Sequence, residues 1–322
     1  MIKLSKKIKF EVAKLSSNKN IMKGILWATL ASAFWGISGT ILQFVSQDAE
    51  IPAAWFLSVR TLFSGIILLV ISAIAYRGKI FNVFKDRKSI LCIVGYAIFG
   101  LGANLLSFFL SVQTGNAASA TILQYLAPLF ILLGGFFFMH RRPNRIDLLV
   151  FVIALVGVVL SITRGDISEL SIPPVSLFWG IISGITAACY VVIPRPLMSD
   201  NSPLTVLGWG TLIASFFFNL HQPVWVGVPH LTTGGVIGIA AIVIIGTVLP
   251  FACLLHSMKY ASSADVSLVD AVQPVMTFIL SVLFLHTQIS LMEVVGSALV
   301  VVAIYILQNY KRKLATKDEL KS

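Results

Sequence analysis

Long apolar runs separated by short polar connections follow one another along almost the entire chain. A transmembrane helix needs about 20 mostly apolar residues, because the hydrocarbon layer is roughly 30 Å thick and each helical residue adds about 1.5 Å. Ten runs meet this requirement, and they lie at residues 23–44, 53–76, 89–112, 116–138, 145–163, 174–193, 203–221, 233–256, 262–286 and 290–309. The pattern therefore predicts an all-α integral membrane protein with ten transmembrane helices and no separate soluble domain.

The composition supports this interpretation. Of the 322 residues, 57% are hydrophobic and 11% are charged, whereas a soluble domain has about 25% charged residues. A cytosolic globular protein is therefore excluded. The net charge of +11 would suggest nucleic acid as a partner of a soluble protein, but here its distribution along the chain gives a different explanation.

The basic residues gather in alternate connections. If the amino terminus is cytoplasmic, 22 of the 24 Lys and Arg residues lie on the cytoplasmic side. They belong to residues 1–23, to the cytoplasmic connections between spans, or to the tail 310–322. Positive charge is retained on the cytoplasmic side of a membrane protein. We expect both termini to be cytoplasmic, in a multi-pass protein of the cell membrane that has the lipid bilayer as partner and binds no nucleic acid.

An internal repeat divides the chain into two halves. A shift of 146 residues aligns the segment 89–160 with the second half without a gap, so that Pro128 meets Pro274 and Gly100 meets Gly246. Because each half contains five predicted spans, an odd number, the second copy must lie upside down relative to the first. Inverted repeats are typical of transporters that work by alternating access, with the substrate site near the membrane midplane.

The predicted domains follow from this repeat. The first five-helix repeat is expected over 23–163 and the second, inverted repeat over 174–309. The basic cytoplasmic segments 1–22 and 310–322 flank them.

Several short motifs occur in one order along the two halves, and they are Ala33–Gly36, Arg60 with the apolar run after it, Ala118–Pro128, Pro274 with Ile279–Phe284, and Glu293–Gly296. In order and spacing the chain resembles the ten-helix, EamA-type members of the drug/metabolite transporter superfamily over residues 24–309. The resemblance implies secondary transport of a small metabolite, often an amino acid or related compound, with many members exporting. One departure is His140 and His286, where the family commonly has Glu.

One acidic residue lies deep within a predicted span. An ionisable group in hydrocarbon costs several kcal/mol by the insertion scale and is a functional candidate. Asp270 lies eight residues into its span, with Gln273 adjacent. It belongs to a stripe of polar and small residues at helical spacing, which comprises Ser263, Ser267, Asp270, Pro274, Thr277 and Ser281. The stripe faces either a polar cavity or neighbouring helices, and we favour the cavity.

The repeat supplies a second polar stripe opposite the first. Asp270 corresponds to Gln124, which has Tyr125 beside it. Asn104 and Trp35, from two further spans, line the same cavity or pack between helices, and the sequence favours neither. Two further candidates each have two possible roles. Tyr190 lines the cavity or packs in the core, and Arg60 contacts the substrate or stabilises the fold.

Two prolines at repeat-equivalent positions are candidates for bending points. Pro128 and Pro274 each remove a backbone donor inside a span and so free a carbonyl close to Gln124 or Asp270.

The sequence contains no cofactor or metal-binding motif, so transport is expected to be driven by gradients. We expect a secondary active transporter, an exporter by family resemblance, of a small amine or zwitterion such as an amino acid. In it, Asp270 contacts the cationic end of the substrate or exchanges a proton, and the second alternative would couple transport to protons. The alternatives are a passive facilitator or channel and, less favoured, an intramembrane enzyme. Asp265 and Asp270 are five residues apart and point about 140° from each other around a helix, which argues against a two-acid hydrolase. The sequence leaves the oligomeric state and the particular substrate open.

Overall fold

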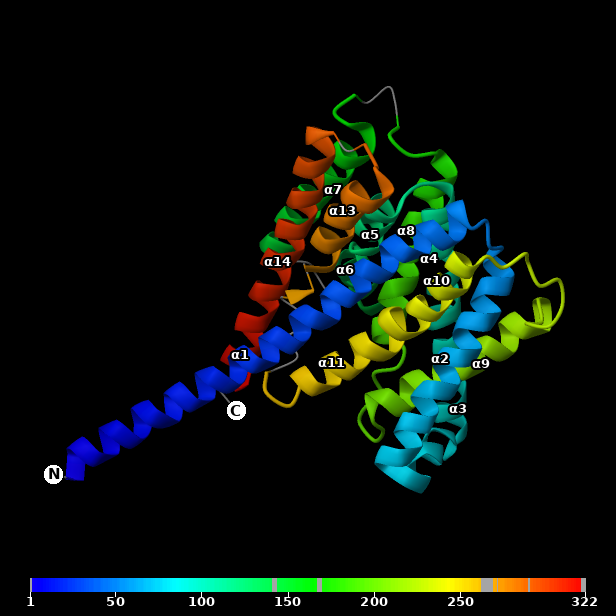
Figure 1. Ribbon diagram of the computed structural model, residues 1–322. Coiled ribbons are helices and arrows are strands. Elements are labelled where there is room, and N and C mark those ends of the chain that lie inside the picture. The colour runs from blue at the N-terminus through cyan, green and yellow to red at the C-terminus, as the bar shows by residue number, and fades with distance from the viewer. Residues whose placement is uncertain are drawn as a thin grey trace.

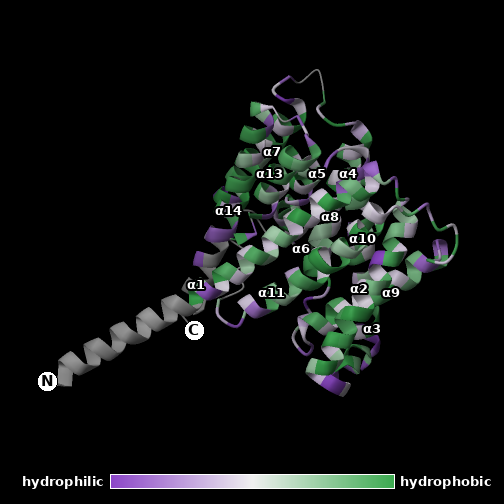
Figure 2. Ribbon diagram, in the orientation of Figure 1, coloured by the Kyte–Doolittle hydropathy of each residue, from purple (hydrophilic) through white to green (hydrophobic). Residues whose placement is uncertain are grey.

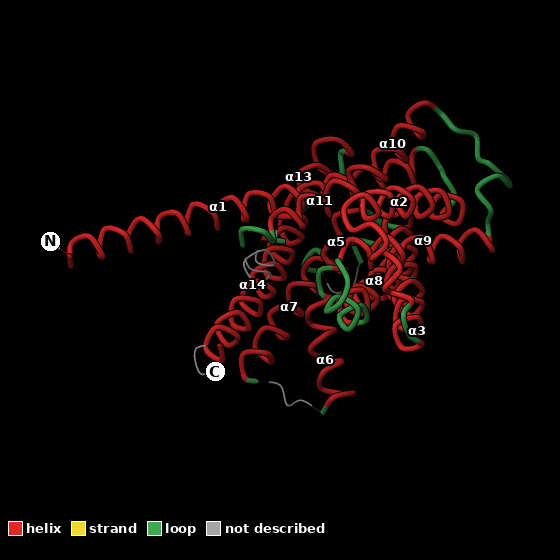
Figure 3. The backbone as a smooth tube through the Cα atoms, turned by 90° about the horizontal axis from the view of Figure 1, so that it is seen from below, coloured by secondary structure: helices red, strands yellow, loops and turns green. Residues whose placement is uncertain are grey.

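The computed structural model describes residues 2–140, 144–166, 170–261, 269–270, 272–288 and 290–319, and in this part of the chain helices are joined by loops and turns, without strands (Figures 1 and 3). The helices are α1 (Ile2–Gln43), α2 (Ala53–Tyr76), α3 (Arg87–Gly95), α4 (Ala103–Thr114), α5 (Ala117–Gln124), α6 (Ala127–Met139), α7 (Arg145–Thr163), α8 (Pro174–Val192), α9 (Pro203–His221), α10 (Thr233–Val243), α11 (Leu249–Ser257), α13 (Val272–Leu285) and α14 (Leu291–Glu319). Three π-helical segments join or extend them, at Phe44–Asp48, Tyr96–Gly102 and Ile244–Val248.

Within the described residues, nine helical segments are long and apolar enough to cross a membrane. They correspond to nine of the ten predicted spans. The remaining predicted span, 262–286, is represented by the shorter apolar helix α13, because residues 262–268 lie outside the described part. The all-helical membrane fold is therefore confirmed, whereas the count of ten stays a prediction.

The outer surface of the bundle is apolar. Large hydrophobic side chains such as Phe138, Ile74 and Leu91 are 87%, 78% and 73% exposed, and hydrophobic residues cover the helices in Figure 2. Exposed apolar surface on this scale is unfavourable in water. It is the surface that a multi-pass membrane protein presents to lipid.

Close helix pairs hold the bundle together. Helix α2 packs along α9, α7 along α14, and α4 along α8, while α1 contacts α11 and α13. The α7–α14 contact is tight because Gly157 and Gly296 face each other: a Cβ atom on Gly296 would lie less than 2.5 Å from the Gly157 carbonyl oxygen. Small residues allow such close approach of helix backbones in membranes.

Several local features recur at the 146-residue spacing of the predicted repeat. Asp86 caps α3 by accepting a hydrogen bond from the Ser89 amide, and Thr232 caps α10 in the same way through Gly235. The π-helical segments around Gly100 and Gly246 are also 146 residues apart. So are the left-handed residues His140 and His286, with φ of 50° and 49°. These features agree with the repeat, whose inverted arrangement stays a prediction.

The basic segment that precedes the first predicted span continues the same helix. Helix α1 runs without interruption from Ile2 to Gln43, and its amino-terminal part projects beyond the bundle (Figures 1 and 3).

Candidate substrate site

A cavity of about 670 Å³ lies in the centre of the bundle. Eight of the nine candidate spans and α13 contribute to its lining, which takes side chains from both predicted repeats. A volume of this size is typical of a site for a small organic molecule.

The cavity brings together all eight residues that the sequence singled out as substrate-binding candidates. They are Trp35, Arg60, Asn104, Gln124, Tyr125, Tyr190, Asp270 and Gln273. Pro128 also lines the cavity, whereas Pro274 is buried in α13 and does not. Side chains on six different helical segments therefore converge on one space.

Hydrogen bonds fix one polar wall of the cavity. The side-chain amide of Gln124 donates to Ser183 Oγ at 3.0 Å and to Asn104 Oδ1 at 3.3 Å. Asn104 in turn donates to the Ser183 carbonyl oxygen at 3.0 Å and reaches Thr186 Oγ1 at 3.4 Å. Because these contacts join α4, α5 and α8, they hold the two amides in fixed positions at the cavity surface.

Asp270, which is partly exposed, lines the same cavity. Its carboxylate accepts a long hydrogen bond from Ser32 Oγ, at 3.4 Å. A carboxylate has about four lone-pair sites, and among the described residues Ser32 fills one of them weakly. The acid can therefore receive hydrogen bonds from a ligand.

Both acid and amide lie where helices are interrupted. Helix α5 ends at Gln124 and α6 begins at Ala127, with Pro128 at its second position. Asp270 lies in a turn before α13, and the backbone amide of Gln273 donates to the backbone carbonyl oxygen of Asp270 at 3.0 Å. A proline cannot donate to the carbonyl four residues earlier, so neither Gln124 nor Asp270 receives the helical hydrogen bond that Pro128 or Pro274 would otherwise supply.

Aromatic residues cover the sides of the cavity. Trp35 packs edge-on against Phe251 with ring centroids 5.4 Å apart, and the ring centroids of Tyr190 and Tyr96 are 5.5 Å apart. These rings provide apolar surface for a ligand between the polar walls.

Arg60 brings positive charge into the cavity. Within the described part of the chain, its guanidinium has neither a hydrogen bond nor an ion pair, and Ser64, one turn further along α2, has a buried hydroxyl without a partner. The cavity thus contains a cation and an acid from different helices.

Sequence reasoning missed several lining residues. Thr61, Thr211 and Thr247 are ordinary in apolar helices, and the first two turn their hydroxyls back to their own helix. Arg195 and Gln308 lie near the ends of spans, where polar residues are expected in any membrane protein. Only the phase of Gln308 on its helix could have indicated that it faces the interior.

The two ends of the cavity differ. Toward the carboxyl-terminal ends of α8 and α14 the lining reaches Val191 and Arg195, both exposed. At the other end the lining stops at Leu42, beyond which Val45, Val112 and Ala117 are completely buried. A layer of packed residues from α1, α2, α4, α5 and α10 closes this end.

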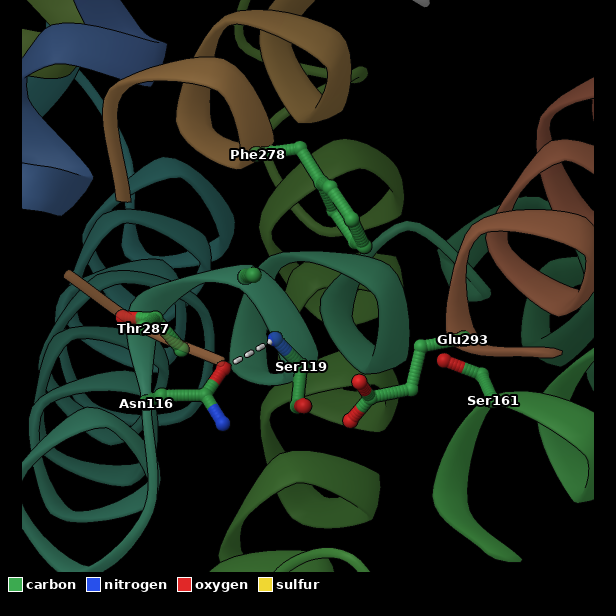
Figure 4. A pocket seen from close by; sticks show the side chains of 7 residues that line it. Asn116, Ser119, Ser161, Phe278, Thr287 and Glu293 are labelled. Carbon is green, nitrogen blue, oxygen red and sulfur yellow. Dashed lines mark hydrogen bonds between the residues drawn. The ribbon is translucent and has the colours of Figure 1, made fainter. Parts of the chain in front are cut away.

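A second, much smaller cavity lies between α5, α7, α13 and α14 (Figure 4). It has room for about one water molecule, at about 10 Å³. Glu293 borders it, pairs with Arg164 at 3.2 Å and accepts a hydrogen bond from the Ser290 amide at 2.7 Å. These contacts satisfy the buried carboxylate and stabilise the start of α14.

Fold and cavity together define a multi-pass membrane protein with a central polar site. Models of the EamA-like transporter family match this chain twice, over residues 22–163 and 175–308. The chain therefore belongs to the EamA-like transporter family, which confirms the resemblance inferred from its motifs.

Individual relatives agree with this assignment. An uncharacterized inner membrane transporter of Salmonella typhimurium, YicL, is 30% identical over 299 residues, which cover 91% of this chain and 97% of that protein. An uncharacterized transporter of Archaeoglobus fulgidus is 27% identical over 303 residues, covering 88% and 98%. A solved crystal structure with 19% identity has a TM-score of 0.58 and covers 93% of this chain and 98% of its own, a likeness that shows the fold alone. Family and relatives are transporters by name, rather than enzymes.

Proposed function

We propose that this protein is a secondary active transporter that moves a small amine or zwitterion, such as an amino acid, by alternating access. The observation that carries the proposal is that Asp270 lines the same central cavity as the hydrogen-bonded amides of Gln124 and Asn104. A cationic group of the substrate binds Asp270, and its remaining polar atoms contact the amide wall.

Proton coupling follows from the same carboxylate. Asp270 binds either a substrate cation or a proton, since each neutralises the same charge. Competition between the two would couple movement of substrate in one direction to movement of a proton in the other. With both termini in the cytoplasm, as the distribution of Lys and Arg predicts, an inward proton gradient would drive export.

Alternating access requires two structures that exchange the open end of the cavity. The recurrence of caps and π-helical segments at a spacing of 146 residues supports two equivalent halves. In the predicted topology, the open end described above faces the cytoplasm, so this structure corresponds to the inward-facing state. A passive facilitator is the second candidate, because the same cavity would bind its solute.

A ligand screen tests the proposed substrate class. Purified protein is heated with amines, amino acids, nucleosides and organic acids at two pH values, because a bound ligand raises the melting temperature by mass action. We expect stabilisation by amines or zwitterions that disappears in Asp270→Asn. The matched control Asp200→Asn changes an exposed acid outside the cavity and should keep the response.

Two results would contradict this assignment. Amines that stabilise Asp270→Asn as much as the unmodified protein would remove Asp270 from the site. Stabilisation only by organic acids, lost in Arg60→Gln and retained in Asp270→Asn, would make Arg60 the main substrate contact instead.

A further inference from the structure

Three glutamines connect the end of α1 to the junction of α4 and α5, at the closed end of the cavity. Gln47 donates its side-chain amide to the carbonyl oxygens of Val112 and Gly115, both at 2.8 Å, and to that of Gln113 at 3.2 Å. Helix α4 ends at Thr114, so these carbonyls lack the amide that the next helical turn would supply, and the Val112 carbonyl oxygen otherwise accepts only a longer hydrogen bond from the Gly115 backbone amide, at 3.3 Å, among the described residues. One side chain therefore caps the end of α4.

The other two glutamines extend the connection. Gln43 Oε1 accepts a hydrogen bond from the amide of Ala117, the first residue of α5, at 2.8 Å. Gln113 donates in the reverse direction to the Ser46 carbonyl oxygen at 3.3 Å. Both helix ends at the α4–α5 junction are thus satisfied by α1 and the π-helical segment that follows it.

These contacts lie directly above the cavity. Leu42 is the last residue of α1 in the cavity lining, and Gln43 follows it with 8% exposure. In the same way Phe108 lines the cavity on α4, while Phe109 and Val112 are completely buried. A path from the cavity to this end of the bundle that separates α1 from the α4–α5 junction would break these hydrogen bonds.

We propose that Gln43, Gln47 and Gln113 form a gate that holds this end of the cavity closed and opens in the alternate state of the transport cycle. This inference rests on the proposed alternating access and adds the residues that control it. Hydrogen bonds suit a reversible closure, because water replaces the lost partners when the helices separate and the net stabilisation per bond is modest. Packed apolar residues alone would also close that end, but they would not fix how α1 is aligned with the α4–α5 junction.

Sidedness of chemical labelling tests the gate without knowledge of the substrate. The three native cysteines are replaced by serine, and Phe108→Cys places one thiol in the cavity just below the gate. A membrane-impermeant thiol reagent is then applied to right-side-out and to inside-out vesicles. We expect faster labelling from the side on which Arg195 lies, the open end of the cavity.

The variant Gln47→Ala should change the ratio of the labelling rates from the two sides. Loss of its hydrogen bonds should speed labelling from the gate side by roughly 5- to 30-fold, the factor that corresponds to one or two typical hydrogen bonds. Labelling from the Arg195 side should become slower, because fewer molecules are in the state in which the gate is closed and the Arg195 side is open. Gln222→Ala is the matched control: its amide contacts the exposed Val226 carbonyl oxygen in the α9–α10 connection, outside the gate, and its labelling should not change.

Further results decide between a gate and a purely structural role. A lower melting temperature with unchanged labelling from both sides would overturn the gate. If Gln47→Ala does not fold, Gln113→Ala removes a single hydrogen bond and should change labelling in the same direction but less, and no change would again overturn the proposal. Labelling that responds as expected in a protein that transports nothing would contradict the proposed function and leave the gate standing.

Discussion

Gly36 lies where α1 crosses α13 beside the cavity, and an added methyl group there would perturb the wall that carries Gln273. A Cβ atom at this position would lie 2.7 Å from Met276 Cβ, 2.8 Å from the Gln273 carbonyl oxygen and 3.1 Å from the Thr277 amide nitrogen. Thr277 also donates from Oγ1 to the Gly36 carbonyl oxygen at 3.3 Å. The variant Gly36→Ala therefore forces the two helices apart.

The size of the effect follows from these distances. Carbon atoms pack best at about 3.5 Å or more, so the Met276 contact alone requires a separation of roughly 0.8 Å. Overpacking of this kind costs about 1–3 kcal/mol, and the Thr277 hydrogen bond is stretched in addition. We expect Gly36→Ala to lower the free energy of unfolding in detergent by about 1–3 kcal/mol. We also expect any ligand that contacts Gln273 to raise the melting temperature of this variant less than that of the unmodified protein.

Gly134 provides a control with the opposite expectation. It lies in α6, and a Cβ atom there would lie within 4 Å of no side chain and of no other helix in the described part of the chain. Because alanine favours a helix over glycine by about 1 kcal/mol, Gly134→Ala should leave the protein unchanged or stabilise it. Equal stability of Gly36→Ala and the unmodified protein would refute the close packing of α1 on α13.

Two ion pairs at opposite ends of the bundle give further predictions. A hydrogen bond and the charge of Lys85 hold the pKa of Asp200 below its ordinary value, and the same contacts raise the pKa of Lys85. The contribution of this exposed pair is therefore lost only as the pH falls through the lowered pKa of Asp200 or rises through the raised pKa of Lys85. The difference in melting temperature between the unmodified protein and Asp200→Asn should be small and constant from about pH 5 to 9, and a steep change within that range would contradict the pairing. By contrast, Glu293 is 5% exposed. The variant Glu293→Ala removes the acceptor of the Ser290 amide and leaves Arg164 with its hydrogen bond to the Gln288 carbonyl oxygen, so it should lower the unfolding free energy by about 1–3 kcal/mol. In an Arg164→Ala background the same substitution should cost less, and equal costs in both backgrounds would show that the pair is not coupled.

Much of the site was predictable because polar side chains are exceptional inside apolar helices. Asp270, Gln124 and Asn104 stand out in sequence for this reason, and their helical spacing places them on inward faces. The repeat then related Asp270 to Gln124, two residues that the structure places in the same cavity.

Other features depend on contacts that a single sequence does not reveal. Gln43 and Gln47 lie at the end of a span, where amides are common, and their role as helix caps appears only when α4 and α5 are beside them. The π-helical segments around Gly100 and Gly246 have no distinct sequence pattern. That Pro128 lines the cavity whereas its repeat equivalent Pro274 does not could not be inferred from the repeat either.

Transport by reconstituted protein tests the central claim most directly. Proteoliposomes containing the unmodified protein or Asp270→Asn are given the amine or zwitterion identified by the ligand screen, with and without a pH gradient. We predict accumulation against the substrate gradient that requires the pH gradient and is abolished in Asp270→Asn. Equilibration of the substrate without accumulation, unaffected by the pH gradient or by Asp270→Asn, would contradict secondary active transport and indicate a passive facilitator.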